Sequence, residues 1–130
     1  MLNLDFECAK ISEQIKNVLL TSEPKARKEA ESLITKAIGV LQEDGIYAFY
    51  LYLKARQKPI YTSIEEETMK LLKMVFPSLN IDRQGHQVAR DLVSDLDKIL
   101  LAKELLERVL IYSRYHAKAL GEGMTGGEET

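Results

Sequence analysis

The chain has 130 residues, and its 18 Lys and Arg against 20 Asp and Glu give a formal net charge of -2. Hydrophobic residues make up 45% and charged residues 29%, which excludes a disordered chain and is typical of one globular domain. No apolar run reaches the roughly 18–20 residues of a membrane span, and the single Cys8 forms no internal disulfide. These features predict a cytoplasmic protein without contact to a membrane.

The first two predicted helices follow from hydrophobic spacing. A single apolar stripe with spacings of three and four begins near the N-terminus and comprises Leu4, Cys8, Ile11, Ile15, Val18 and Leu19. Residues 21–24 end this helix and start a second one, because Pro24 is tolerated in a first turn and Ser22 or Thr21 can cap it. We expect the second helix to end near Gly45, where glycine can adopt the left-handed conformation.

Residues 46–56 form an aromatic segment that we predict to be a third helix. The alternation of tyrosines is also compatible with a strand, but Ala48, Leu51 and Ala55 favour a helix. Such a helix is apolar nearly all round, so we expect it to be central or to lie at an interface. Its predicted partner-interface residues are Tyr47, Tyr50 and Tyr52.

A loop over residues 57–62 precedes the fourth predicted helix. Ser63 and Glu66 have the spacing of a capping box, in which each side chain accepts a hydrogen bond from the other residue's backbone N–H. The helix should stop near Phe76, because Pro77 disfavours a helical conformation in the residue before it. The acidic residues 65–67 fit the positive end of a helix better than a cation site.

The remaining helical pattern begins near Asp82 or Arg83 and continues to residue 120. Its first part is expected to bury Val88, Leu92, Val93 and Leu96. Asp95 or Asp97 can cap a fresh helix, so one long helix and two shorter ones both remain open.

The predicted architecture is an all-α, compact bundle of five to six helices. We expect a single helical domain over residues 1–120 and a flexible, Gly-rich acidic tail over residues 121–130. Without that tail the domain carries eighteen basic and seventeen acidic side chains, so the mild acidity belongs to the tail.

The sequence contains few groups of residues that could form a catalytic site. His86 and His116 are thirty residues apart, and neither has a second His or Cys at metal-ligand spacing. Cys8 lies on an apolar stripe, as expected of a core residue. We therefore predict no catalytic residue, no metal, no cofactor and no small-molecule substrate. An enzyme remains an alternative only if metal ligands from distant helices converge in the fold.

Basic residues are more clustered than the net charge suggests. Residues 24–58 hold seven basic and four acidic side chains, and further basic residues lie near Gln87 and near two tyrosines close to the C-terminus. Fixed cations suit phosphate contacts, and tyrosine can stack with bases, whereas a solvated charged surface explains the same spacing. The predicted RNA-binding residues are Lys54, Arg56, Lys58, Arg83, Arg90, Arg114 and Lys118.

Residues 41–54 resemble the small helical subunit family of the type III-B CRISPR Cmr complex. Asp44, Gly45 and Ile46 match the family's polar-Gly-aliphatic turn, and an apolar aromatic helix ending in Lys54 follows. Tyr47 and Ala48 depart from the family pattern. Residues 104–120 are similar to the family's last helix, and the length and helical character agree.

The resemblance implies a non-catalytic subunit in antiviral defence. Such a subunit packs beside its own copies and other Cmr complex subunits and lines the groove for the guide and target RNA, while another subunit cleaves the target. The alternative is a helical protein–protein adaptor with no nucleic acid, which would use the tyrosine-rich third helix as an anchor.

Overall fold

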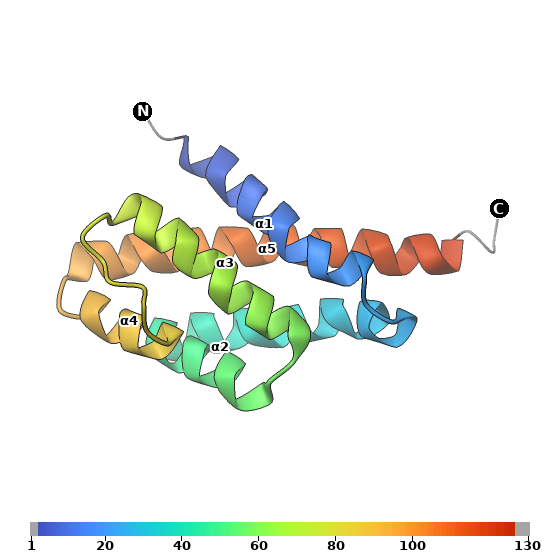
Figure 1. Cartoon of the computed structure of the whole chain (residues 1–130), viewed down its shortest axis with the longest axis horizontal. Helices are drawn as coiled ribbons and strands as arrows, with labels where there is room; N and C mark the ends of the chain where they lie inside the picture. The colour runs from blue at the N-terminus through green and yellow to red at the C-terminus, as the bar shows by residue number, and fades with distance from the viewer. Residues whose placement is uncertain (1–2, 127–130) are drawn as a thin grey trace.

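Five helices follow one another along residues 3–126, the part of the chain that the computed structural model describes (Figure 1). They are α1 (Leu4–Leu20), α2 (Pro24–Arg56), α3 (Pro59–Val75), α4 (Gly85–Leu92) and α5 (Leu96–Gly126). The predicted all-α fold is confirmed, since this range contains no strand. Within the same residues, no helix combines the length and apolar character that crossing a membrane requires.

Helix α5 makes the most extensive contacts of the bundle, because it packs against both α1 and α2. Figure 1 shows α5 along the whole molecule, with α1 and α3 crossing it. The buried surface of α5 is formed by Ala102, Leu105, Leu106, Val109, Leu110 and Ala117. Cys8 of α1 is fully buried against it and its Sγ lies 3.8 Å from the Leu105 carbonyl oxygen. Burial raises the pKa of the Cys8 thiol to about 11, which confirms its expected place in the core.

The junction between α1 and α2 is closed by side chains that bind the last carbonyls of α1. The Arg27 guanidinium donates to the carbonyls of Leu19 and Leu20 at 2.7 and 2.9 Å. The Ser22 hydroxyl donates to the Val18 carbonyl at 2.6 Å, so it serves the end of α1 instead of capping α2. Pro24 is the first residue of α2, as predicted.

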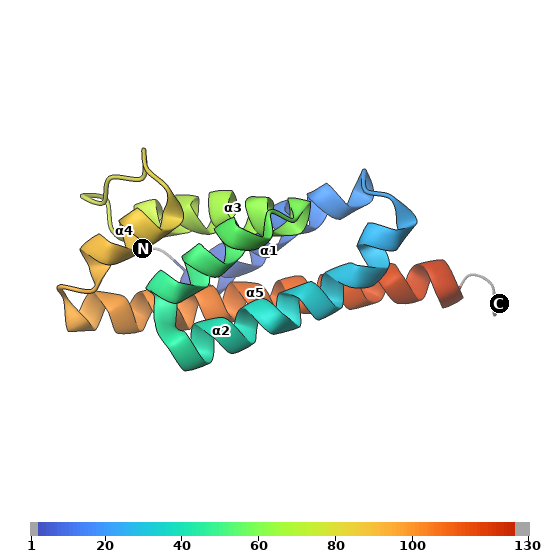
Figure 2. The same ribbon diagram turned by 90° about the horizontal axis from the view of Figure 1, so that it is seen from below.

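A sharp break at Gly45 divides α2 into a first arm, residues 24–44, and a second arm, residues 46–56. Gly45 has φ 91° and ψ -178°, a region that essentially only glycine occupies. The predicted end of one helix and start of another at this position are confirmed, although the conformation is extended instead of left-handed helical. Figure 2 shows the second arm folding back from the first.

The start of α3 differs from the prediction. The helix begins at Pro59, where the Thr62 N–H already bonds the Lys58 carbonyl at 3.0 Å, so the predicted capping box at Ser63 is wrong. Ile60 and Tyr61 are buried in the first turn. Their burial stabilises the extra turn more than a surface cap would stabilise a later start.

Two helices occupy the region where one or two were expected. The Asp95 carboxylate accepts the Lys98 N–H at 3.2 Å and caps α5, whereas α4 has ended at Leu92. Val93 and Leu96 are 55% and 69% exposed because they lie at the corner between the helices, so their predicted burial is wrong.

The last helix is longer than predicted. It extends to Gly126, six residues beyond the expected domain boundary at residue 120. The rest of the predicted tail, residues 127–130, lies outside the described residues.

Candidate nucleic-acid interface

The reversal of α2 at Gly45 creates a cleft of about 530 Å³ between its two arms. In an unbroken helix, Lys36 and Arg56 would stand roughly 30 Å apart, but here both line the same cleft. We call it the cationic cleft, and its lining residues are Glu29, Ser32, Leu33, Lys36, Tyr52, Arg56 and Lys58.

Positive charge dominates the cationic cleft. Its lining includes three cations, Lys36, Arg56 and Lys58, and one carboxylate, Glu29. All three cationic residues are exposed, and none pairs with a carboxylate among the side chains of residues 3–121. Like charges held in one concave surface favour the approach of an anion.

Two tyrosines and an arginine pack in a row, which we call the stack, at the side of the cationic cleft. The ring centroids of Tyr52 and Tyr61 are 5.6 Å apart with the ring planes tilted at 55°, and the Arg56 guanidinium carbon lies 5.2 Å from the Tyr52 centroid. The Tyr61 hydroxyl donates to the Leu33 carbonyl on the first arm at 2.5 Å. Burial raises the pKa of Tyr61 above its ordinary value, so the hydroxyl remains a donor at neutral pH. This bond ties the stack to both walls of the cleft.

A smaller cleft of about 300 Å³ adjoins the cationic cleft and shares Glu29, Leu33 and Lys58 with it. It adds Lys25 from the start of α2 and lies beside Pro59 at the start of α3. Glu23, the N-cap residue of α2, also lines this cleft, so the carboxylates of Glu23 and Glu29 balance the charges of Lys25 and Lys58. The smaller cleft therefore does not extend the positive charge of the cationic cleft.

A second cleft of about 530 Å³ lies between the second arm of α2, α3 and the α3–α4 loop. It contains two cations and three carboxylates, and we call it the mixed-charge cleft. Its lining residues are Lys54, Thr62, Glu65, Glu66, Met69, Asp82, Arg83, Gln84 and Gln87.

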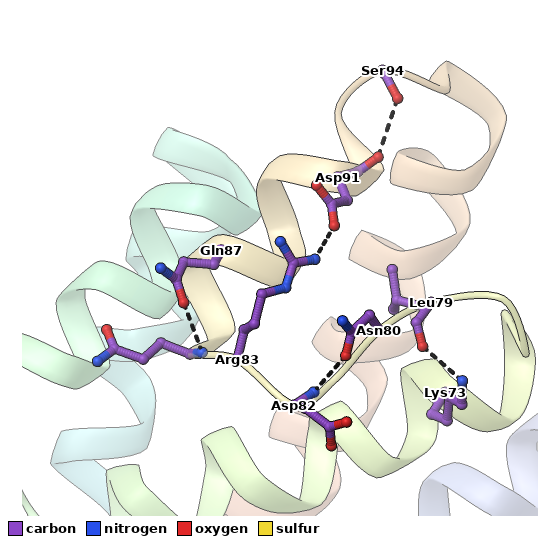
Figure 3. A network of polar contacts seen from close by, with 9 residues as sticks. Lys73, Leu79, Asn80, Asp82, Arg83, Gln87, Asp91 and Ser94 are labelled. Carbon is purple, nitrogen blue, oxygen red and sulfur yellow. Dashed lines mark hydrogen bonds and ion pairs between the residues drawn. The ribbon is translucent and has the colours of Figure 1, made fainter.

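The α3–α4 loop beside the mixed-charge cleft is held by its own polar contacts (Figure 3). Arg83 forms an ion pair with Asp91 of α4, so its charge is balanced within the chain. Lys73 donates to two loop carbonyls at 2.6 and 2.8 Å, and the Asn80 side chain accepts the Asp82 N–H at 2.9 Å. These cations stabilise the loop and are less available to an external phosphate.

The structure divides the predicted RNA-binding residues. Arg56 and Lys58 lie in the cationic cleft, Lys54 and Arg83 in the mixed-charge cleft, and Arg90, Arg114 and Lys118 on α4 and α5. In Figure 1, α4 lies at one end of the molecule and the C-terminal part of α5 at the other, so the seven residues do not form one surface. Sequence reasoning missed Lys36 as a site residue, although it counted Lys36 in the basic stretch. The signal was the glycine between Lys36 and Arg56, which permits the two arms to face each other.

The predicted interface tyrosines also separate. Tyr50 is fully buried and its hydroxyl lies 2.8 Å from the Thr68 hydroxyl, so its predicted contact with a partner is wrong. The arm packs this side chain beneath α4 instead of presenting it to solvent. Tyr52 lines the cationic cleft. Tyr47 is 42% exposed, and its ring packs nearly perpendicular to the His86 ring with 6.0 Å between the two ring centroids.

The described residues contain no group of three His, Cys, Asp or Glu side chains that could hold a metal ion. His116 lies on α5, and its partial burial and the nearby Lys16 lower its pKa. His86 lies on α4 and its Nδ1 is buried without a hydrogen-bond partner.

Comparison of the chain with protein-family models, with curated proteins and with solved structures found no match. The cationic cleft combines an excess of positive charge with a defined shape.

Proposed function

We propose that this chain is a non-catalytic small subunit of a type III-B CRISPR Cmr effector complex and contacts the phosphates of the guide and target RNA. The observation that carries the proposal is the cationic cleft, whose Lys36, Arg56 and Lys58 have no carboxylate partner in the described chain. The resemblance of residues 41–54 to the Cmr small subunit supplies the choice of complex.

The proposed mechanism is electrostatic. Lysine and arginine side chains displace counterions from RNA phosphates and hold the strand without reading its sequence. Arg90, Arg114 and Lys118 are further contacts in this proposal, since no ion pair involves them among the side chains of residues 3–121. Arg83 and Lys54 are not among the proposed contacts, because acidic side chains line the cleft around them.

The proposed role in antiviral defence is structural. The subunit would pack against its own copies and other Cmr subunits in the cytoplasm, and cleavage of the target would belong to another subunit. A surface with modest positive charge suits contact with RNA inside an assembly, because many weak phosphate contacts add along the complex.

The test is purification of the tagged full-length chain from its native cells, followed by ultraviolet crosslinking and identification of the bound RNA and proteins. We expect guide RNA and other Cmr subunits to co-purify. The double charge reversal Arg56→Glu with Lys58→Glu should lower crosslinked RNA at least fivefold and flatten its dependence on salt.

The matched control is Lys54→Glu, which reverses a charge two residues away in the mixed-charge cleft. It should change RNA retention less than twofold. Absence of RNA from the wild-type assembly would overturn the proposal, as would unchanged crosslinking by the Arg56 and Lys58 double variant.

The helical adaptor is the second candidate, and one surface favours it. Val93, Leu96 and Leu100 are 55%, 69% and 57% exposed at the corner between α4 and α5. Leu96 and Leu100 are one turn apart on α5, and exposed apolar side chains that lie together are typical of a protein-binding surface. In the same purification, protein partners that remain after nuclease treatment while no RNA is recovered would favour the adaptor.

A further inference from the structure

The cationic cleft has the dimensions of a small-ligand site. Its volume of about 530 Å³ lies within the 300–1,000 Å³ range of pockets that hold compact organic ligands. It lies between the two arms of α2 and Lys58, which follows the second arm. A cleft of this volume is large enough for one nucleotide of an RNA strand.

The charges of the cleft are distributed over both walls. Lys36 belongs to the first arm, whereas Arg56 and Lys58 belong to the end of the second arm and the residues after it. In the described chain, no carboxylate forms an ion pair with these cations. A phosphate bound between the walls would therefore reduce the repulsion between them. Glu29 leaves the lining with a net charge of +2, enough to select an anion over a neutral ligand.

The stacked side chains offer a second kind of contact. The Arg56 guanidinium carbon lies 5.2 Å from the Tyr52 ring centroid, and Tyr52 packs in turn against Tyr61. Because Arg56 is exposed and lines the cleft, its guanidinium group is accessible to a ligand. Guanidinium planes and aromatic rings are the surfaces on which proteins stack unpaired bases.

The stack is held in place before any ligand arrives. The Tyr61 hydroxyl bond to the Leu33 carbonyl spans from α3 to the first arm of α2, and both Tyr61 and the cleft-lining Leu33 are well packed. A surface that is already ordered loses little conformational entropy when a ligand binds.

We propose that the cationic cleft is a subsite for a single nucleotide. Lys36 and Lys58 hold its phosphate, and the Arg56 guanidinium, supported by Tyr52, stacks on its base. The inference rests on the proposed function, since the nucleotide would belong to the bound RNA strand. The required chemistry is a planar base joined to a phosphate, which a free nucleotide also provides.

The experiment is a titration of the full-length chain followed by nuclear magnetic resonance, with AMP, adenosine, ribose 5-phosphate and a short single-stranded oligoribonucleotide as probes. AMP should bind at least tenfold more tightly than adenosine and at least threefold more tightly than ribose 5-phosphate. Tighter binding of the oligonucleotide than of AMP would assign the nucleotide to a strand, and the reverse order would assign it to the free ligand.

Three variants separate charge from stacking. Lys36→Gln and Lys58→Gln should each weaken AMP binding about tenfold. Arg56→Lys keeps the charge but lacks the planar group, so it should reduce the preference for AMP over ribose 5-phosphate to near unity. Lys54→Gln, the control in the mixed-charge cleft, should leave AMP binding unchanged.

The outcomes distinguish this inference from the proposed function. Equal effects of Lys54→Gln and Lys58→Gln on AMP binding would overturn the subsite, even if the native assembly still retained RNA through Arg90, Arg114 and Lys118. An unchanged base preference in Arg56→Lys would overturn the stacking contact. An assembly that lacks RNA, together with AMP binding as described, would overturn the proposed function and leave a site for free nucleotides.

Discussion

The cationic cleft and the mixed-charge cleft each measure about 530 Å³, and both use the second arm of α2 as a wall. Lys54 lines the mixed-charge cleft and Arg56 lines the cationic cleft, because side chains two residues apart on a helix point to nearly opposite sides. The mixed-charge cleft contains three carboxylates and the cationic cleft contains one. The position of acidic residues on neighbouring helices therefore decides which part of a basic stretch remains available to bind an anion.

The strongest way to break this comparison is to remove the bend that forms the cationic cleft. Gly45→Ala places a side chain at φ 91° and ψ -178°, so we expect a loss of about 3 kcal/mol in the free energy of unfolding. Urea unfolding measures this loss. The matched control is Gly39→Ala, where an added Cβ meets nothing within 4 Å and should stabilise the helix by about 0.5–1 kcal/mol. Similar effects of the two substitutions would show that the bend does not depend on glycine.

Gly85→Ala acts on the side of the second arm of α2 that faces α4 and the mixed-charge cleft. An added Cβ would lie 2.4 and 2.7 Å from Tyr50 Cδ1 and Cγ, so α4 must move, and we expect a loss of about 2 kcal/mol. The bond from the Gly85 N–H to Glu65, now 2.7 Å, would weaken as well. Hydrogen exchange should become faster in α4, whereas AMP binding at the cationic cleft should persist. Loss of AMP binding would contradict the independence of the two clefts.

A buried tyrosine supports each cleft, and alkaline pH tests both. Burial raises the pKa of Tyr50 and Tyr61, so the unfolded chain releases these protons first and stability falls as the pH rises above 10. We expect Tyr50→Phe and Tyr61→Phe each to cost about 1 kcal/mol at pH 7 and to make the alkaline loss shallower. Urea midpoints from pH 8 to 11 give the slopes. Slopes that match the wild type would mean that the hydroxyls are not buried in solution.

Glu29→Gln gives the smallest expected change and sharpens the comparison. It removes the carboxylate of the cationic cleft, so affinity for AMP should rise about threefold at low salt. Glu66→Gln removes a carboxylate from the mixed-charge cleft and should leave that affinity unchanged. Titrations at 50 and 200 mM salt check both variants, and a rise in both would show that only the net charge of the chain matters.

The helices themselves could be predicted because apolar spacing, proline and glycine act locally. The stripe through Cys8 and Ile15, the stop before Pro77 and the break at Gly45 all depend on residues close together in the sequence. The start of α3 was misplaced because burial of Ile60 and Tyr61 depends on helices distant in sequence. Tyr50 was misassigned for the same reason, since α4 covers it.

The candidate site could be predicted only in part. Arg56 and Lys58 were found from charge clustering, but Lys36 required knowledge that the two arms of α2 face each other. Arg83 was an equally reasonable candidate until Asp91, eight residues away, was seen to balance its charge. Pairing across a bend or between helices depends on direction in space, which periodicity alone does not provide.

The position of α5 has a consequence for how the chain reaches its native state. Ribosomes deliver α1 to α4 first, yet the apolar surfaces of α1 and α2 both pack against the helix that is synthesised last. Cys8, for example, packs against Leu105, which lies 97 positions later in the chain. The faces of α1 and α2 that contact α5 are thus uncovered until the end of synthesis, and closure of the core is a late step in biosynthesis.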